Sequence, residues 1–489
     1  MSTINKVEFS FSPLFDIMVL MFSKVKNLIP EKWRLVLLWV IAVLSLIWIC
    51  FQYARIAHFP TGDDPAIHIL FIQQNTFAGI WQNLSYPIPL TIFKYFQEIS
   101  GLDYPKAFVS IISTFLCFSS IAVFLLTKKV TNNWLFSFVG AIIFATGGWV
   151  TDGLRMGLLA ESFGWGMLAL TLYFLISQNI TLTLIFSGLL ALSHPFSFVI
   201  FVFVAVLYLL ITMFSKDKKE RNFAIILASI YLIGVLLISV FDREIISKFV
   251  DFVNPERAGW GERKLWEIAT TYSPRRVIVA FFALIGLISS IGQWSKPAIK
   301  VAYLLLFIGL FMSMNQIFGI RFLVFRFFPY LEMGLAIFAV LGIHYFVEKL
   351  KVNKYKNIFI IAITIFAIAP HYIENGRAVY SQVNDASMNA SMTEGDQVAF
   401  GWIRENTKPT ASIVATHKRI IWIKVLTDNK KTEDDITPFD LVATKNLYDS
   451  GNGFAYDYFY YSEVDQVPEQ IRKNFKLIYS KMGVRIYKR

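Results

Sequence analysis

Residues 61–68 of this chain, Thr-Gly-Asp-Asp-Pro-Ala-Ile-His, combine residue types that acid–base chemistry needs. The neighbouring carboxylates Asp63 and Asp64 are followed one helical turn later by His68. A carboxylate can deprotonate an attacking hydroxyl, and a like-charged neighbour tends to raise one of the two pKa values into a useful range. Carboxylates also bind Mg²⁺ or Mn²⁺. The motif predicts catalysis or metal binding at Asp63 and Asp64 and a substrate contact at His68. The structural alternative is that Asp64 only caps a helix begun by Pro65.

A second acidic group lies between two apolar runs at residues 149–161. Asp152 and Arg155 occur in Trp-Val-Thr-Asp-Gly-Leu-Arg-Met-Gly, and Glu161 follows shortly after. Ionisable side chains near membrane depth are rare and are usually functional or paired. We expect Asp152 and Glu161 to form a second acidic site and Arg155 to bind an anion. Alternatively, Asp152 and Arg155 pair with each other, three residues apart, and close a helix hairpin.

Basic side chains among aromatic residues supply candidate anion ligands. Arg321 and Arg326 lie in the segment 319–330, and the planar guanidinium of arginine suits a phosphate. The alternative is that both arginines are interfacial anchors whose stems cover apolar surface. His194, directly before Pro195, falls at a helix end and could contact substrate or serve only as a hydrogen-bonding structural residue.

Composition decides the class of protein. The chain has 489 residues, of which 56% are hydrophobic and only 16% charged, compared with about 25% charged in an ordinary soluble domain. This excludes a soluble multidomain enzyme and a disordered chain, and it predicts a polytopic membrane protein. The net charge of +12 reflects basic residues in short loops, as the positive-inside rule expects, so nucleic acid is excluded as a partner. No P-loop, G-x-S-x-G, H-E-x-x-H or C-x-x-C motif occurs.

Apolar runs long enough to cross a bilayer predict about eleven transmembrane helices. Residues 180–194 and 196–214 are the least certain pair, because Pro195 separates them and a single kinked or re-entrant element is the alternative. The candidate spans are 34–53, 106–127, 134–150, 158–177, 180–194, 196–214, 223–241, 276–293, 298–316, 323–346 and 357–373.

Loop charge predicts the orientation in the plasma membrane. A cytoplasmic N-terminal segment, 1–33, containing a surface helix near 11–28, places four basic loops on the inner side. The transmembrane domain, 34–374, then has long outer loops at 54–105 and 242–275. The first has apolar residues at helical spacing over 65–81 and a second short helix over 86–99, and both can lie in the interface plane.

The loop at 242–275 carries Arg257 and Arg263 between Trp260 and Trp266. These side chains could bind sugar by stacking and phosphate by charge, or they could belong to an amphipathic surface helix. Residues 375–489 form a small extracytoplasmic domain of α/β or α+β class. It is predicted to contain a helix over 394–406, a β-branched run at 412–416 and a strand pair at 476–480 and 483–487.

Together these features resemble the GT-C class of integral-membrane glycosyltransferases. The resemblance covers most of the chain, and four motifs carry it: Gly62-x-Asp64-x-x-x-His68, Ser193-His194-Pro195, the segment with Arg321 and Arg326, and residues 399–407. It implies a polyprenyl-phosphate-sugar donor presented at the outer face, membrane lipids as surroundings, and a glycan, lipid or protein as the acceptor.

The same resemblance implies roles for the residues. Asp64 would be the general base or a metal-linked carboxylate, with Asp63 in support. Asp152 and Glu161 would form the second acidic site, and Arg321 or Arg326 would hold the lipid phosphate and stabilise its developing charge. A Trp-Trp-Asp motif of the oligosaccharyltransferase type is missing, which favours transfer of a single hexose or pentose. A polyprenyl-linked glycan polymerase or ligase, a lipid or solute transporter, and a non-enzymatic scaffold are the rival interpretations.

Overall fold

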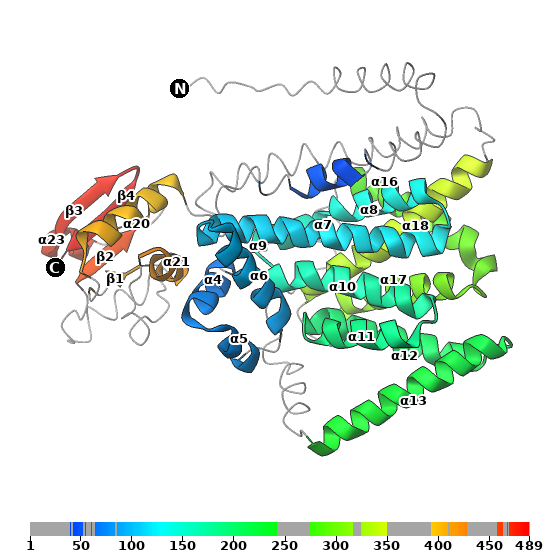
Figure 1. Cartoon of the computed structure of the whole chain (residues 1–489). Helices are drawn as coiled ribbons and strands as arrows, with labels where there is room; N and C mark the ends of the chain where they lie inside the picture. Colours follow the sequence, from blue (N-terminus) through cyan, green and yellow to red (C-terminus); the bar gives the residue numbers. More distant parts are fainter. Residues whose placement is uncertain are drawn as a thin grey trace. The chain divides into compact units, whose positions relative to one another are not determined.

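The computed structural model (Figure 1) describes residues 43–51, 64–83, 86–241, 274–315, 324–349, 393–408, 413–415, 417–427, 457–462 and 469–488, with a few isolated positions. The chain divides into two units, Met1–Trp48 and Ile49–Arg489, and the candidate site lies in the second. The predicted surface helix at 11–28, the loop at 242–275 and the span at 357–373 lie outside the described residues, and the span at 34–53 does so in part.

Most of the described chain is helical and apolar, which confirms a membrane protein. Among the described residues, four helices are long and apolar enough to cross a membrane: α7 (Tyr104–Thr131), α10 (Leu159–Ile176), α12 (Pro195–Met213) and α18 (Phe328–Lys349). Shorter apolar helices are α8 (Trp134–Ala145), α11 (Ile180–Ala191), α16 (Pro274–Ser290) and α17 (Pro297–Ser313). The 24-residue helix α13 (Lys218–Phe241) follows α12. The predicted number of eleven is therefore not tested.

Two boundaries differ from the predicted spans. The run 134–150 ends as a helix at Ala145, and a separate short helix, α9 (Gly148–Met156), begins after Gly147. The run 323–346 starts with a 3-10 turn, η4 (Val324–Phe327), and α18 begins only at Phe328, with Pro329 in its first turn. Both differences matter, because they create helix starts beside the candidate site.

The uncertain pair at 180–194 and 196–214 forms two helices, α11 and α12, and whether they are two spans or one kinked or re-entrant element stays a prediction. A turn at residues 192–194 separates α11 from α12, and Pro195 occupies the first position of α12, where its missing N–H costs nothing. α11 has 12 residues, fewer than the roughly 20 that span a bilayer.

Helix α18 is central to the bundle, because α8, α16 and α17 all pack against it. Its crossing with α16 depends on two glycines. A Cβ atom on Gly286 would lie 1.9 Å from the carbonyl oxygen of Phe338, and one on Gly342 would lie 1.9 Å from that of Phe282. Only glycine allows the two backbones this approach, as is common between membrane helices.

Helices α7 and α10 lie side by side and run in the same direction (Figure 1). The ring of Phe115 contacts Phe163 near the start of α10, and Lys129 approaches the ring of Tyr173 near its end. The Ser119 hydroxyl donates to the Ser162 carbonyl at 2.5 Å. Ser119 is 15 residues beyond Tyr104, about 22 Å of helix, so α10 begins deep alongside α7.

The described residues of the predicted first outer loop form three short helices. The stretch 65–81 contains two helices, α4 (Asp64–Gln74) and α5 (Phe77–Asn83), where the spacing indicated one helical stretch. Asn75 ends α4 by donating to the Phe71 carbonyl, and Thr76 accepts from the Gly79 N–H at the start of α5. The second predicted helix, 86–99, is α6 (Pro87–Ser100).

The described C-terminal residues form a four-stranded sheet with three helices. The strand order is β1 (Ile413–Val414), β2 (Tyr458–Tyr461), β4 (Val484–Lys488), β3 (Lys476–Lys481), with β1 parallel to β2 and the other pairs antiparallel. The predicted strand pair is confirmed, and its turn uses Met482 and Gly483, both with positive φ. The helix predicted at 394–406 is α20 (Glu394–Asn406). A capping box between Thr393 and Asp396 stabilises its start. α21 (His417–Thr427) and α23 (Glu469–Asn474) follow it.

Candidate functional site

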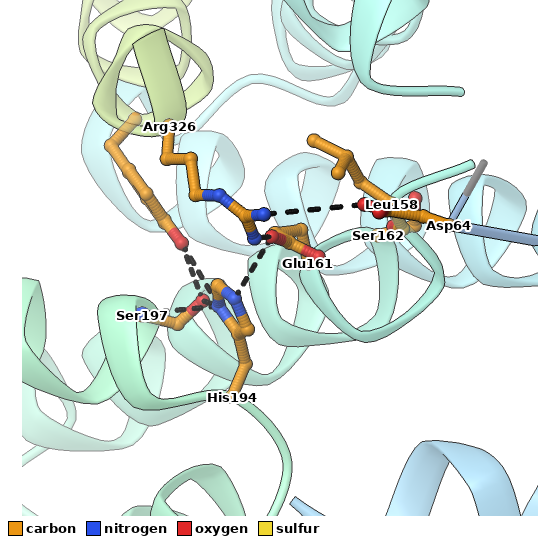
Figure 2. Close-up of polar contacts among 8 residues, drawn as sticks. Asp64, Leu158, Glu161, Ser162, His194, Ser197 and Arg326 are labelled. Carbon is orange, nitrogen blue, oxygen red and sulfur yellow. Dashed lines mark hydrogen bonds and ion pairs between the residues drawn. The ribbon is translucent and has the colours of Figure 1, made fainter. Parts of the chain in front are cut away.

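Three charged side chains from distant parts of the chain meet at one point (Figure 2). Arg326 makes an ion pair and a hydrogen bond through Nη1 with Glu161 Oε1, and its Nη2 lies 4.0 Å from Asp64 Oδ2. The exposed fractions of the side chains are 5% for Glu161, 26% for Arg326 and 38% for Asp64. The guanidinium therefore joins a buried carboxylate to one that solvent or substrate can reach.

Helix starts position this cluster. Asp64 is the first residue of α4, Glu161 lies in the first turn of α10, and Arg326 lies in η4 directly before α18. The exposed N–H groups at a helix start give it partial positive charge, which favours carboxylates there. Pro65 and Pro329 each fit a first helical turn. The local sequence thus fixes where each helix begins, and packing between the helices brings the beginnings together.

His194 contacts the same oxygen of Glu161 as Arg326 does. Its Nε2 lies 3.4 Å from Glu161 Oε1, and its Nδ1 accepts from the Ser197 backbone N–H at 3.3 Å, which caps α12. The Ser197 hydroxyl lies 2.9 Å from the same Nδ1 and 2.7 Å from the Tyr330 hydroxyl. Since Nδ1 accepts a backbone N–H, this geometry assigns the proton of a neutral ring to Nε2, facing Glu161. The carboxylate is therefore fixed by two donors.

Close packing leaves this arrangement little freedom. A Cβ on Gly164 would lie 2.5 Å from Ser197 Oγ and 2.6 Å from His194 Cβ, so α10 and α12 approach each other only through a glycine. The Arg326 guanidinium also lies 5.5 Å from the ring of Phe196, within cation–π range.

The charges keep Arg326 protonated. Burial alone would lower its pKa, but Glu161 and then Asp64 outweigh burial and raise the pKa of Arg326 above its ordinary value. Two carboxylates and one guanidinium give the cluster a net charge of −1 when all three are ionised. A permanent cation beside an accessible carboxylate can stabilise a leaving anion while the carboxylate takes a proton.

Two aromatic side chains lie beside Asp64 and the guanidinium. The ring of His68 stacks on Phe108, with centroids 6.4 Å apart, and meets Tyr86 edge-on at 6.5 Å. Burial lowers the pKa of His68 to about 4 and raises the pKa of Tyr86 to about 12. Both side chains are therefore neutral at pH 7, and they offer ring faces and hydrogen bonds but no charge.

The structure brings together four of the predicted site residues: Asp64, Glu161, His194 and Arg326. His68 lies next to them, and His194 is buried behind Glu161. Asp152 and Arg155 are on α9, but their side chains are not described. The other predicted site residues lie outside the described chain. The roles predicted for both groups therefore stay predictions. The undescribed residues are Asp63, Arg257, Arg263 and Arg321.

Sequence reasoning missed Ser197, Tyr330 and Glu332. Ser197 follows His194 by three residues, a capping interval, and Tyr330 follows Arg326 by four, so both carried a readable signal. Glu332 is a single acidic residue inside an apolar run, which is itself a marker of function or pairing at membrane depth.

A metal does not fit the described part of the cluster. Among the described residues no group of three or more His, Cys, Asp or Glu side chains could hold a metal ion. Both described carboxylates face the Arg326 guanidinium, whose charge opposes a cation there. Asp63 lies outside the described residues, so Mg²⁺ or Mn²⁺ binding by Asp63 with Asp64 stays a prediction, and we derive no step through a metal.

No protein-family model matches the chain, and no curated protein matches it. Among solved structures, it is similar to ArnT from Cupriavidus metallidurans bound to undecaprenyl phosphate, at 10% identity and a TM-score of 0.49, covering 92% of this chain and 97% of that one. It is also similar to the arabinofuranosyltransferase AftD from Mycobacteria, at 13% identity and a TM-score of 0.49, covering 94% of this chain but 40% of AftD. Because both TM-scores are below 0.5, we infer function from the side chains of the site.

Proposed function

We propose that this protein is a membrane glycosyltransferase that moves a sugar from a polyprenyl-phosphate-linked donor to a glycan, lipid or protein acceptor at the outer face of the plasma membrane. The observation that supports it is the Arg326 guanidinium between the accessible Asp64 and the buried Glu161. This arrangement offers a cation for a leaving phosphate and a base for an acceptor hydroxyl within one cluster.

The proposed reaction balances as a single group transfer. The acceptor oxygen forms a bond to the anomeric carbon as the bond from that carbon to the phosphate oxygen breaks. The electron pair of the broken bond stays on the polyprenyl phosphate, whose charge Arg326 stabilises, and the acceptor proton moves to Asp64. Glu161 and His194 keep the guanidinium in place, and the Asp64 proton passes to water when the products leave.

The membrane surroundings suit a donor with a long apolar tail. In the described part of the chain four helices are long enough to span, and the cluster lies at the starts of two of them, α10 and α18. A phosphate held at these helix starts would leave the polyprenyl chain among apolar helix surfaces, and helix starts themselves favour phosphate. The sugar transferred is a hexose or a pentose.

A transfer assay tests the proposal. Purified protein in lipid would receive a panel of undecaprenyl-phosphate-monosaccharides, and release of free undecaprenyl phosphate would be measured by mass spectrometry. We expect release with at least one donor in the wild type and loss of release in Asp64→Asn. Asp217→Asn is the matched control, because Asp217 is exposed and caps α13 far from the site in sequence, and asparagine retains that cap. Equal release from Asp64→Asn, or none from folded wild type with any donor, would overturn the proposal.

A further inference from the structure

The short helix α9 lies between α8 and α10 and carries Asp152 and Arg155. Its N-cap residue is Gly147, which has no side chain with which to accept the exposed N–H groups of the first turn. The carboxylate of Glu332, on α18, accepts them instead. It lies 3.2 and 3.1 Å from the Trp149 nitrogen and 3.1 Å from the Val150 nitrogen.

This contact between α9 and α18 is close and specific. A Cβ on Gly147 would lie 2.2 Å from Glu332 Oε2, so only glycine leaves room for the carboxylate. The Trp149 ring stacks on Phe328 with centroids 4.0 Å apart and an interplanar angle of 11°. Phe328 begins α18 two residues after Arg326. The start of α9 is therefore attached to the segment that carries the guanidinium.

The other end of α9 is attached to the segment that carries the base. Its C-cap, Gly157, has a φ of +75°, and a Cβ there would lie 2.2 Å from Pro65 Cγ. Pro65 is the residue after Asp64, and Glu161 follows Gly157 by four residues. Helix α9, nine residues or about 13 Å long, thus lies between the Arg326 segment and the Asp64 segment.

We infer that Glu332 is a positioning residue, which fixes α9 against α18 and through Gly157 and Pro65 sets the separation of Asp64 from Arg326. Loss of Glu332 should therefore change the position of Asp64 relative to Arg326, while the ion pair with Glu161 still holds the guanidinium. The kinetic part of this inference rests on the proposed function, whereas its structural part does not.

Hydrogen–deuterium exchange of the full chain in lipid tests the structural part. In Glu332→Ala we expect the amides of 149–156 to exchange at least about tenfold faster, because two of them lose their acceptor, while α12 keeps wild-type protection. Glu332→Gln retains an acceptor oxygen and should restore part of the protection. The control is Glu348→Gln, which removes an exposed carboxylate from the same helix. Unchanged exchange in Glu332→Ala would overturn the inference whatever the protein catalyses.

The kinetic part is tested with the donor found active. We expect kcat of Glu332→Ala to fall at least about tenfold, since misplacement by about 1 Å is costly. Undecaprenyl phosphate binding in native mass spectrometry should stay within about fivefold of the wild-type value, because loss of the Asp64 contact alone changes it by no more than that. Glu332→Gln should recover part of kcat. Gly157→Ala, which acts at the opposite end of α9, should give the same split between kcat and binding, and Gly188→Ala, with open space around it, should give neither change.

Equal loss of binding and kcat would indicate that Glu332 supports the whole fold, and faster exchange without loss of kcat would show that α9 does not position the base. Either result overturns the inference. If Gly157→Ala fails to fold, the Glu332→Ala and Glu332→Gln pair decides alone. An inactive wild type would count against the proposed function, and exchange would still decide the role of Glu332.

Discussion

Replacing Asp64 by asparagine should change phosphate binding and turnover in opposite directions. Asp64 and the donor phosphate both need the accessible side of the Arg326 guanidinium, because Glu161 occupies its buried side. Asp64 pairs with Arg326 in the ligand-free protein, so an incoming phosphate must compete with the Asp64 carboxylate for the guanidinium. Removing its charge brings the cluster from a net charge of −1 to neutral and leaves the guanidinium more available to an anion.

The size of the binding effect follows from the geometry. At 4.0 Å, two unit charges attract by about 1 kcal/mol in water and about 4 kcal/mol at an effective dielectric constant of about 20. The two side chains are 38% and 26% exposed, so solvent screening reduces the net value to about 0.5–1 kcal/mol. Undecaprenyl phosphate should therefore bind roughly two- to fivefold more tightly to Asp64→Asn. Turnover should fall by about 10²- to 10⁴-fold, because the variant lacks its general base.

Native mass spectrometry of the protein titrated with undecaprenyl phosphate measures the first quantity, and release of the carrier from the donor measures the second. Asp217→Asn should leave both at wild-type values. Weaker phosphate binding by Asp64→Asn would refute the competition and would instead indicate that Asp64 holds the phosphate, as through a shared metal. Wild-type turnover would refute the role of Asp64 as base.

Three further results are expected. The pKa of His68 in the folded protein is about 4, below its ordinary 6.5, so the unfolded chain takes up a proton first as pH falls. The free energy of unfolding should therefore decline between pH 6.5 and 4, by up to about 3 kcal/mol. In denaturant titrations, His68→Phe should lack this pH-dependent loss of stability. Lys300→Met leaves Glu220 buried without the ammonium 3.4 Å away and should cost about 3 kcal/mol of unfolding free energy, much of which the added Glu220→Gln should restore; an effect below about 0.5 kcal/mol would contradict the buried pairing. Chelation of divalent metals should leave turnover within about twofold, since the guanidinium supplies the positive charge, and complete loss would favour metal binding by Asp63 and Asp64 instead.

Much of the architecture was predictable from local sequence. Helices α7, α10 and α12 begin and end within a few residues of the predicted spans, because a long apolar run leaves the backbone few alternatives in a membrane. The strand pair β3–β4 was readable from its Met482-Gly483 turn. In each case the signal lies in neighbouring residues.

The misplaced boundary inside 134–150 has a non-local cause. The pair Gly147-Gly148 weakens a continuing helix, but the apolar run on both sides does not show that the helix must end there. The break occurs where the carboxylate of Glu332, from another helix, occupies the space beside Gly147 and caps a new helix start. The site, too, depends on contacts between distant segments, so the sequence predicted its residues separately but not their meeting. The residue types of Asp64, Glu161 and Arg326 pointed to chemistry, but their pairing depends on packing between α4, α10 and η4.

A structure of the protein with undecaprenyl phosphate bound, determined in lipid, tests the central claim most directly. The phosphate should lie at about 3 Å from the Arg326 guanidinium, the length of a charge-assisted hydrogen bond. Glu161 and His194 should keep their places, and the Asp64 carboxylate should have moved away from Arg326 and should face the anomeric position. A phosphate bound elsewhere, or an intact pair between Asp64 and Arg326 beside a bound phosphate, would contradict it.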